Sequence, residues 1–109
     1  MPEIRDYVLA NGRSPFGRCF ARLDTAAARR VTLALAKIEA GYSGNIKSVG
    51  RGVQEYRIQG HGGLRIYFAH DGHDFVILLS GGNKHEQSAN IKSVQKQMQD
   101  YHTKKDINK

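Results

Sequence analysis

The chain has 109 residues, enough for one domain with a single hydrophobic core but too few for two. Its hydrophobic fraction of 39% and charged fraction of 25% are ordinary for a globular protein, and no stretch approaches the ~20 apolar residues that a membrane-spanning helix needs. The formal net charge is +7, and because the cations are spread along the chain, folding must assemble any basic surface. This balance favours nucleic acid or an acidic protein as the partner.

The cysteine and histidine pattern indicates neither a metal nor another cofactor. The lone Cys19 cannot form an internal disulfide, and no spacing of Cys and His residues is typical of a zinc site. The first residues lack the basic-then-apolar pattern of a signal peptide, so the sequence predicts a cytoplasmic protein without membrane contact.

The N-terminal part predicts one strand and two helices. Residues 4–9 form a candidate strand that ends at an Asn-Gly turn. Ser14 followed by Pro15 is a strong helix start, and this helix is expected to run to about Leu23. Asp24 then caps a second, Ala-rich helix that ends at a glycine.

Three consecutive antiparallel strands are expected next. Alternating apolar and polar residues over 55–58 and 64–68 are typical of half-buried strands, whereas the apolar run 75–79 predicts a strand covered on both faces. Asp71-Gly72 is a two-residue turn signal between the last two strands. This turn predicts the cross-strand pairs Phe68 with Phe75, Ile66 with Ile77 and Leu64 with Leu79.

The first hairpin has a register that brings two arginines together. A loop of Gly60-His61-Gly62 keeps the apolar side chains of both strands on one face. In this register Arg57 lies directly opposite Arg65. Like charges placed in this way destabilise a strand pair, so the pair indicates either a neutralising acid, for which Glu55 is the candidate, or an anionic ligand.

The last predicted element is a helix that begins at Asn83, where Glu86 completes a capping box. Residues 103–109 are expected to form a frayed tail, which leaves residues 1–102 as a single domain. The elements together predict an α+β protein, with a mostly antiparallel sheet, two N-terminal helices and one C-terminal helix. The buried stripe of the last helix is expected to consist of Ile91, Val94, Met98 and Tyr101.

Several short motifs follow one another along the chain. They are Ser14-Pro15-Phe16, Gly52-Val53 with Glu55, Arg57-Ile58, residues 64–68, Gly81-Gly82-Asn83-Lys84, Gln87 and Ile91. In this order they resemble the RelE/ParE toxin superfamily, and most closely its HigB-like branch of addiction module killer proteins. The resemblance covers nearly the whole chain and implies a small RelE-like fold. Two positions depart from the family pattern, because Cys19 stands where a tryptophan is frequent and Asn90 where an aspartate is usual.

The resemblance implies the toxin of a type II toxin–antitoxin module. RelE-like members bind the ribosome and cut messenger RNA, so it implies a metal-free, ribosome-dependent endoribonuclease that inhibits translation. ParE-like relatives share the fold but inhibit DNA gyrase without nuclease chemistry, and a decayed toxin that retains only antitoxin or RNA binding is a third alternative. The implied partner is a small antitoxin, expected to be a helix-turn-helix DNA-binding protein that covers the basic surface.

Metal-free cleavage of RNA needs a deprotonated 2′-hydroxyl, stabilised charge on phosphorus and a protonated leaving oxygen. Arg65, on the strand where RelE-like nucleases keep an active-site arginine, is expected to hold the scissile phosphate, and Arg57 to share its charge. Lys84 lies in the first turn of the last helix, where backbone N–H groups and the helix dipole favour an anion. His85 is the candidate for proton transfer because imidazole titrates near neutrality.

Three further residues are candidates for RNA binding. Lys47 and Arg51 lie in a glycine-rich, basic loop over residues 41–52 and are expected to position the RNA backbone. Tyr67, on the same strand as Arg65, is expected to stack on a base. For Lys84, and for the second-helix cations Arg29, Arg30 and Lys37, a solvated surface role is the alternative interpretation.

Overall fold

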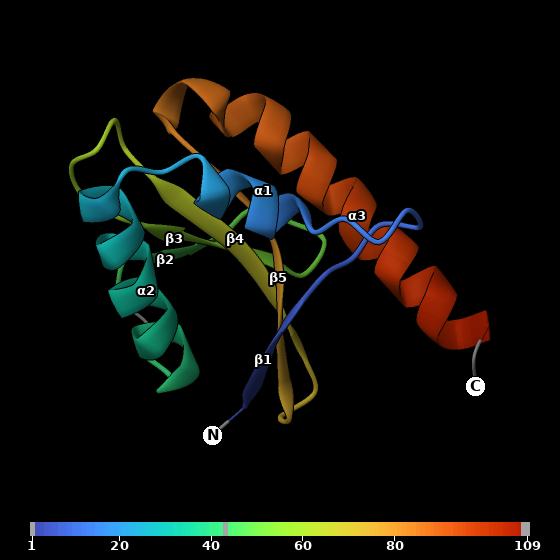
Figure 1. The fold of residues 1–109 in the computed structure, drawn as a ribbon. Helices are drawn as coiled ribbons and strands as arrows, with labels where there is room; N and C mark the ends of the chain where they lie inside the picture. Colours follow the sequence, from blue (N-terminus) through green and yellow to red (C-terminus); the bar gives the residue numbers. More distant parts are fainter. Residues whose placement is uncertain (1, 43, 108–109) are drawn as a thin grey trace.

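The computed structural model describes residues 2–42 and 44–107, which form a five-stranded sheet flanked by helices (Figure 1). The strands are β1 (Glu3–Asp6), β2 (Ile46–Ser48), β3 (Val53–Arg57), β4 (Arg65–Asp71) and β5 (Phe75–Gly82). The helices are α1 (Pro15–Ala21), α2 (Thr25–Glu39) and α3 (Gln87–Ile107), and the short 3-10 helix η1 (Lys84–Glu86) precedes α3. The expected α+β class is confirmed.

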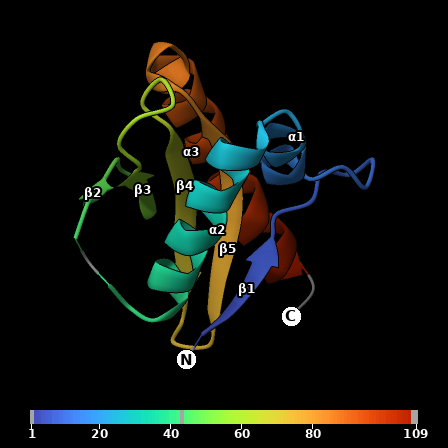
Figure 2. The same cartoon turned by 60° about the vertical axis from the view of Figure 1, so that its left-hand side comes forward.

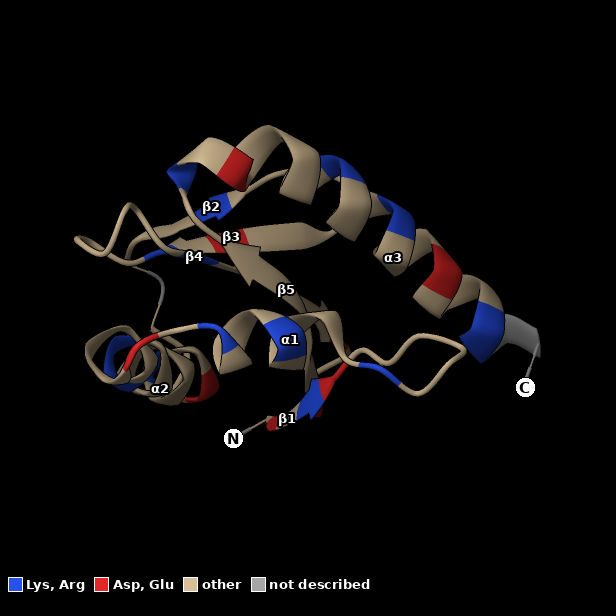
Figure 3. Cartoon of the chain, turned by 45° about the horizontal axis from the view of Figure 1, so that its top comes forward, with Lys and Arg blue, Asp and Glu red and all other residues tan. Residues whose placement is uncertain are grey.

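The sheet is mostly antiparallel and has the spatial order β1-β5-β4-β3-β2 (Figure 2). Only the β1–β5 pair is parallel among the strand pairs of the described residues. Helices cover both faces, because α1 and α2 lie on one side of the sheet and α3 crosses the other (Figure 3). No helix in residues 2–42 and 44–107 is long and apolar enough to cross a membrane.

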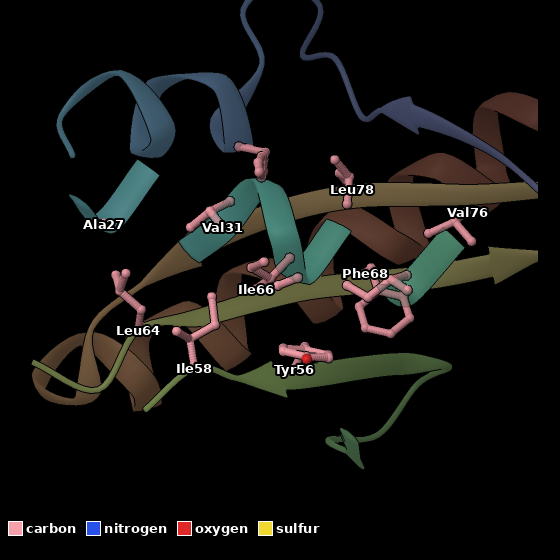
Figure 4. Packing of buried hydrophobic residues seen from close by; sticks show 12 residues of the cluster. Ala27, Val31, Tyr56, Ile58, Leu64, Ile66, Phe68, Val76 and Leu78 are labelled. Atoms are coloured by element: carbon pink, nitrogen blue, oxygen red, sulfur yellow. The ribbon is translucent and has the colours of Figure 1, made fainter. Parts of the chain in front are cut away.

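Each face of the sheet has its own hydrophobic core. The core under α1 and α2 is apolar throughout and is centred on β4 and β5 (Figure 4). The core under α3 includes the predicted helix stripe, with Val94 and Met98 buried and Ile91 and Tyr101 packed against them. The buried members of the first core are Phe16, Ala27, Val31, Ala34, Ile38, Tyr56, Ile58, Leu64, Ile66, Phe68, Val76 and Leu78.

The helix starts lie at the residues that the sequence predicts. The Ser14 hydroxyl accepts a hydrogen bond from Gly17 N at 2.9 Å, and the Asp24 carboxylate accepts one from Ala27 N at 2.8 Å. Asn83 and Glu86 form the expected capping box, in which each side chain accepts from the other residue's backbone N–H. These side chains satisfy donors that the helix itself leaves free, which is why the sequence signal is reliable here.

The predicted register of the first hairpin is confirmed, whereas the predicted register of the second hairpin is wrong. Arg57 pairs with Arg65, and Ile58 N donates to Leu64 O at 2.9 Å. In the second hairpin Phe68 pairs with Leu78 instead of Phe75, because Asp71 belongs to the strand and the loop is residues 72–74. The carboxylate of Asp71 accepts hydrogen bonds from Tyr101 and Lys105 of α3, so a contact far away in the sequence fixes its place.

Three further elements differ from the prediction. The expected loop of residues 41–52 contains the edge strand β2, which pairs with β3 and is only three residues long. Strand β1 ends at Asp6, ahead of the expected residue 9. Helix α3 extends to Ile107, so residues 103–107 of the expected tail are helical, while residues 108 and 109 lie outside the described part of the chain.

Candidate functional site

A hollow of about 520 Å³ opens where β3 ends and β2 and β4 begin. Three of the predicted site cations line it, one from each of these strands: Lys47, Arg57 and Arg65. No acidic side chain is among its lining residues, all of which are in the described part of the chain. We call this feature the site hollow, and it is lined by Asn45, Ile46, Lys47, Arg57, Ile58, Gln59, Gly63, Leu64 and Arg65.

A buried carboxylate lies beneath the facing arginines. Glu55 is 0% exposed, and its Oε1 accepts a hydrogen bond from Arg57 Nε at 3.0 Å. Its Oε2 accepts a hydrogen bond from Gln87 Nε2 at 3.0 Å and lies 3.6 Å from Arg65 Nε. Glu55 is therefore the neutralising acid that the like-charge pair indicates, but one carboxylate offsets only one of the two positive charges.

Glu55 stays ionised in this environment. Burial raises the pKa of its carboxyl group, but hydrogen bonds from Arg57 and Gln87 and the charge of Arg65 outweigh burial and hold that pKa below its ordinary value. Lys47 is the cross-strand neighbour of Glu55 on β2, so a third cation shares this region of the sheet. One negative charge thus accompanies three positive charges, which leaves the hollow with a positive surplus.

The two arginines differ in what they can offer to a ligand. Arg65 is 8% exposed, and its Nη1 donates to the carbonyl oxygen of Gly63 at 2.6 Å, which holds its guanidinium against the β3–β4 loop in the lining of the hollow. The side chain of Arg57 is 49% exposed, so its remaining N–H groups are accessible while Nε stays on Glu55. The more accessible guanidinium is that of Arg57, whereas the sequence predicts Arg65 as the main ligand of the scissile phosphate.

The start of the last helix approaches the hollow through the β3–β4 loop. Gly63 has φ of +75°, and a Cβ there would lie 3.0 Å from Lys84 Cβ and 3.2 Å from Arg65 Nη1, so this close approach needs glycine. The backbone N–H of Lys84 donates to Gly62 O at 3.1 Å. Lys84 therefore lies next to Arg65, and Figure 3 shows the Lys and Arg segments of η1 and of the neighbouring strands at the same end of the sheet.

Tyr67 is not where the predicted stacking would need it. Its side chain is 0% exposed and lies in the core under α3, as the cross-strand neighbour of Glu55. Burial and the charge of Glu55 raise the pKa of the Tyr67 phenol, so it remains neutral. A buried ring offers no face to a base. The prediction did not fit because α3 covers the face of β4 that the alternation of Arg65 and Tyr67 suggested to be open.

Two other candidates lie outside the hollow. Arg51 is in the turn between β2 and β3, at the opposite end of β3 from Arg57. His85 is exposed in η1, next to Lys84, and is not among the residues that line the hollow. No local sequence pattern indicates the structural role of Gln87, because its bond to Glu55 joins residues 32 positions apart. No group of three or more His, Cys, Asp or Glu suited to a metal ion occurs in the described residues.

Comparison of the sequence with known protein families identifies the class of this protein. The family model described as "Phage derived protein Gp49-like (DUF891)" matches residues 18–102, which include the whole site hollow. The chain belongs to this Gp49-like family, which is associated with toxin–antitoxin pairs. An uncharacterized protein of Haemophilus influenzae is 36% identical to it over 63 residues, which cover 58% of this chain and 64% of that protein. The chain therefore spans less than two thirds of the length of this relative.

Proposed function

We propose that this protein is the toxin of a type II toxin–antitoxin module and cuts messenger RNA on the ribosome without a metal. The observation that carries the proposal is the site hollow, where Lys47, Arg57 and Arg65 meet around a single buried carboxylate. A positive surplus in a concave, partly desolvated site is suited to a phosphodiester. Membership of the Gp49-like family supports the toxin role, and the resemblance to RelE-like proteins supports the RNA target.

In the proposed reaction the scissile phosphate enters the hollow and is held by the exposed N–H groups of Arg57 and by Lys47. Arg65 lies below, fixed by Gly63 O, and stabilises the extra negative charge on phosphorus. Glu55 keeps both guanidinium groups oriented without approaching the substrate. As the 2′-oxygen bonds to phosphorus and the bond to the 5′-oxygen breaks, proton transfer from the 2′-hydroxyl to the leaving 5′-oxygen is assigned to His85, which adjoins Lys84 and reaches the bound RNA from η1.

The partners in this proposal are the ribosome with its message and a cognate antitoxin, expected to be a helix-turn-helix DNA-binding protein. An antitoxin that covers the site hollow would block entry of the phosphate. Its acidic groups would speed capture, and its apolar anchors would supply much of the affinity. Family association with toxin–antitoxin pairs supports the existence of this partner.

A non-catalytic toxin, acting on DNA gyrase or another target, is the second candidate. It is favoured by one observation: the lining of the site hollow, within the described residues, includes no imidazole or carboxylic acid that could transfer a proton. Such a surface would bind an anionic or acidic target without cutting it. A decayed toxin that retains only antitoxin or RNA binding would have the same geometry.

The test is induced expression followed by primer extension on cellular messages. We expect new 5′ ends that depend on translation in the wild type and are lost in Arg57→Gln. The matched control is Lys92→Gln, which removes one positive charge from the exposed surface of α3 and should leave the cuts in place. Growth arrest with intact messages and blocked replication would support the gyrase alternative and refute cleavage.

A further inference from the structure

We propose that the exposed surface of α2 binds the sugar–phosphate backbone of the same single RNA strand whose scissile phosphate enters the site hollow. This inference rests on the proposed RNA target and adds a binding surface to it. The sequence alone left the α2 cations Arg29, Arg30 and Lys37 as a helix surface in contact with water. Their position relative to the hollow gives them a second role.

The helix places its cations along one side. Arg30, Leu33 and Lys37 are exposed and follow each other at intervals of three and four residues, so they form one stripe on α2. The two cations are separated by about 10 Å along the helix axis, from the rise of ~1.5 Å per residue. The acids nearest to this stripe in sequence are Asp24, whose carboxylate caps Ala27 N, and Glu39 in the last turn.

This stripe is continuous with the site hollow. A second hollow of about 250 Å³ lies between α2 and β3 and is lined by Arg30, Leu33 and Lys37 on the helix side. On the strand side it is lined by Arg57, and it shares Arg57, Asn45, Ile58 and Gln59 with the site hollow. Arg57 is the charged residue among the four that belong to both hollows. A ligand that contacts Arg57 from the site hollow can continue directly onto α2.

The track continues past Arg30 towards the start of α2. A third hollow of about 520 Å³ shares Arg30 and Leu33 with the second and adds Arg29 and His61. None of the three hollows has an acidic lining residue, and every lining residue lies in the described part of the chain. In Figure 3 the Lys and Arg segments of α2 lie at the same end of the molecule as those around the site hollow. The RNA track, as we name it, consists of Arg29, Arg30, Lys37, Arg57, Lys47 and Arg65.

An exposed aromatic residue follows the Lys37 end of α2. Tyr42 is 64% exposed, and its backbone N–H donates to Lys37 O at 3.0 Å, so it is attached to the last turn of α2. A succession of cations with an exposed ring at its end matches a single strand, because phosphates repeat along the backbone and an unpaired base can stack on the ring. The neutral amides of Asn45 and Gln59 between the cations add donors for phosphate and sugar oxygens.

The first experiment measures how salt weakens binding of a labelled, mixed-sequence 2′-O-methyl RNA strand, which lacks the hydroxyl needed for cleavage. In Arg30→Gln/Lys37→Gln we expect the slope of log affinity against log salt to become shallower by about 1.4, since each lost phosphate contact on a single strand contributes about 0.7. The control is Lys92→Gln/Lys96→Gln, which removes two charges from α3 on the other face of the sheet and should keep the wild-type slope. Circular dichroism and thermal unfolding check that both variants are folded.

A second measurement uses the same strand and tests the ring. Tyr42→Ala should weaken binding about fivefold or more without changing the salt slope, whereas Tyr42→Phe should keep wild-type affinity. Equal salt slopes in the two double variants would overturn the proposal. Two other results would also overturn it. If the α2 variant weakened binding only to ribosomes, α2 would be assigned to ribosomal RNA. If it weakened binding only to polyglutamate, α2 would be assigned to an acidic protein.

The two proposals fail in different ways. If the wild type makes translation-dependent cuts and the α2 variant keeps the full salt slope, the RNA track is refuted and the nuclease proposal stands. If the wild type cuts no message but the α2 variant has a shallower salt slope, the RNA track is supported and the nuclease proposal is refuted.

Discussion

The two faces of the sheet are built from the same strands but are filled differently. The face under α1 and α2 carries an apolar core without a buried charge among the described residues. The face under α3 is apolar over its middle and ends in Glu55, Arg65 and Tyr67, which are all buried. Buried ion pairs add little stability over apolar packing of the same volume. The charged end of the α3 face is therefore better explained by the adjoining site hollow than by stability.

The largest loss of stability is expected in the apolar face. Phe68 is buried between β4 and the helices, and Phe68→Ala removes its ring from the core shown in Figure 4. We expect a loss of about 3–5 kcal/mol in the free energy of unfolding, because the cavity cost adds to the lost transfer free energy. Urea unfolding followed by circular dichroism measures it. The control Val8→Ala, at an exposed apolar residue, should change little.

The next largest effect is expected at the charged end of the α3 face. Glu55→Gln leaves Arg65 buried without a counter-charge and breaks the ion pair to Arg57. We expect a loss of about 2–4 kcal/mol, less than for a fully buried pair because Arg57 can turn towards water. The same urea titration measures it. A variant as stable as the wild type would show that the carboxylate is dispensable for folding.

The difference in unfolding free energy between the wild type and Glu55→Gln should depend on pH. The pKa of Glu55 is lowered in the folded protein, so its contribution is fully present above the unfolded value of about 4.3 and is lost as pH falls through the folded value. The gap between the wild type and Glu55→Gln should therefore narrow below about pH 4. A gap that widens on acidification would contradict the assignment of Glu55 as the ionised group.

The sequence could predict the features that are determined by residues close together along the chain. The caps at Ser14, Asp24 and Asn83 act within three residues, so a local pattern is sufficient to find them. The β3–β4 register followed from alternation, because only one register keeps apolar side chains together. Facing arginines could therefore be predicted before the fold was known.

The failures have a common physical origin in contacts between distant segments. The predicted β4–β5 register was wrong because β5 is apolar on both faces, so the sequence pattern does not distinguish one register from another. The place of Asp71 in β4 is fixed instead by its bonds to α3. The burial of Tyr67 depends on where α3 crosses the sheet. The bond of Gln87 to Glu55 and the continuity of α2 with the site hollow likewise depend on tertiary packing, and no spacing in the sequence indicates them.

A smaller effect is expected at the helix start that borders the site. Asn83→Ala removes the acceptor for Glu86 N, which lies 3.1 Å from Asn83 Oδ1. The expected cost is about 1 kcal/mol in the free energy of unfolding, the usual cost of losing such a cap. Asn83→Ser, which keeps a capping oxygen, should recover most of it. If both variants lost the same stability, the capping box would not be the cause.

The smallest loss of stability is expected for Arg57, although it is proposed to be central to function. Arg57→Gln removes a hydrogen bond to Glu55 but also relieves the repulsion between Arg57 and Arg65, and the side chain is half exposed. We expect a change within about 0.5 kcal/mol in the free energy of unfolding, measured by urea titration, together with loss of growth arrest on induction. A destabilisation as large as that of Glu55→Gln would make Arg57 a structural partner of the carboxylate, and loss of growth arrest could then be attributed to unfolding. Loss of growth arrest in a variant of wild-type stability would instead assign the exposed guanidinium to the target.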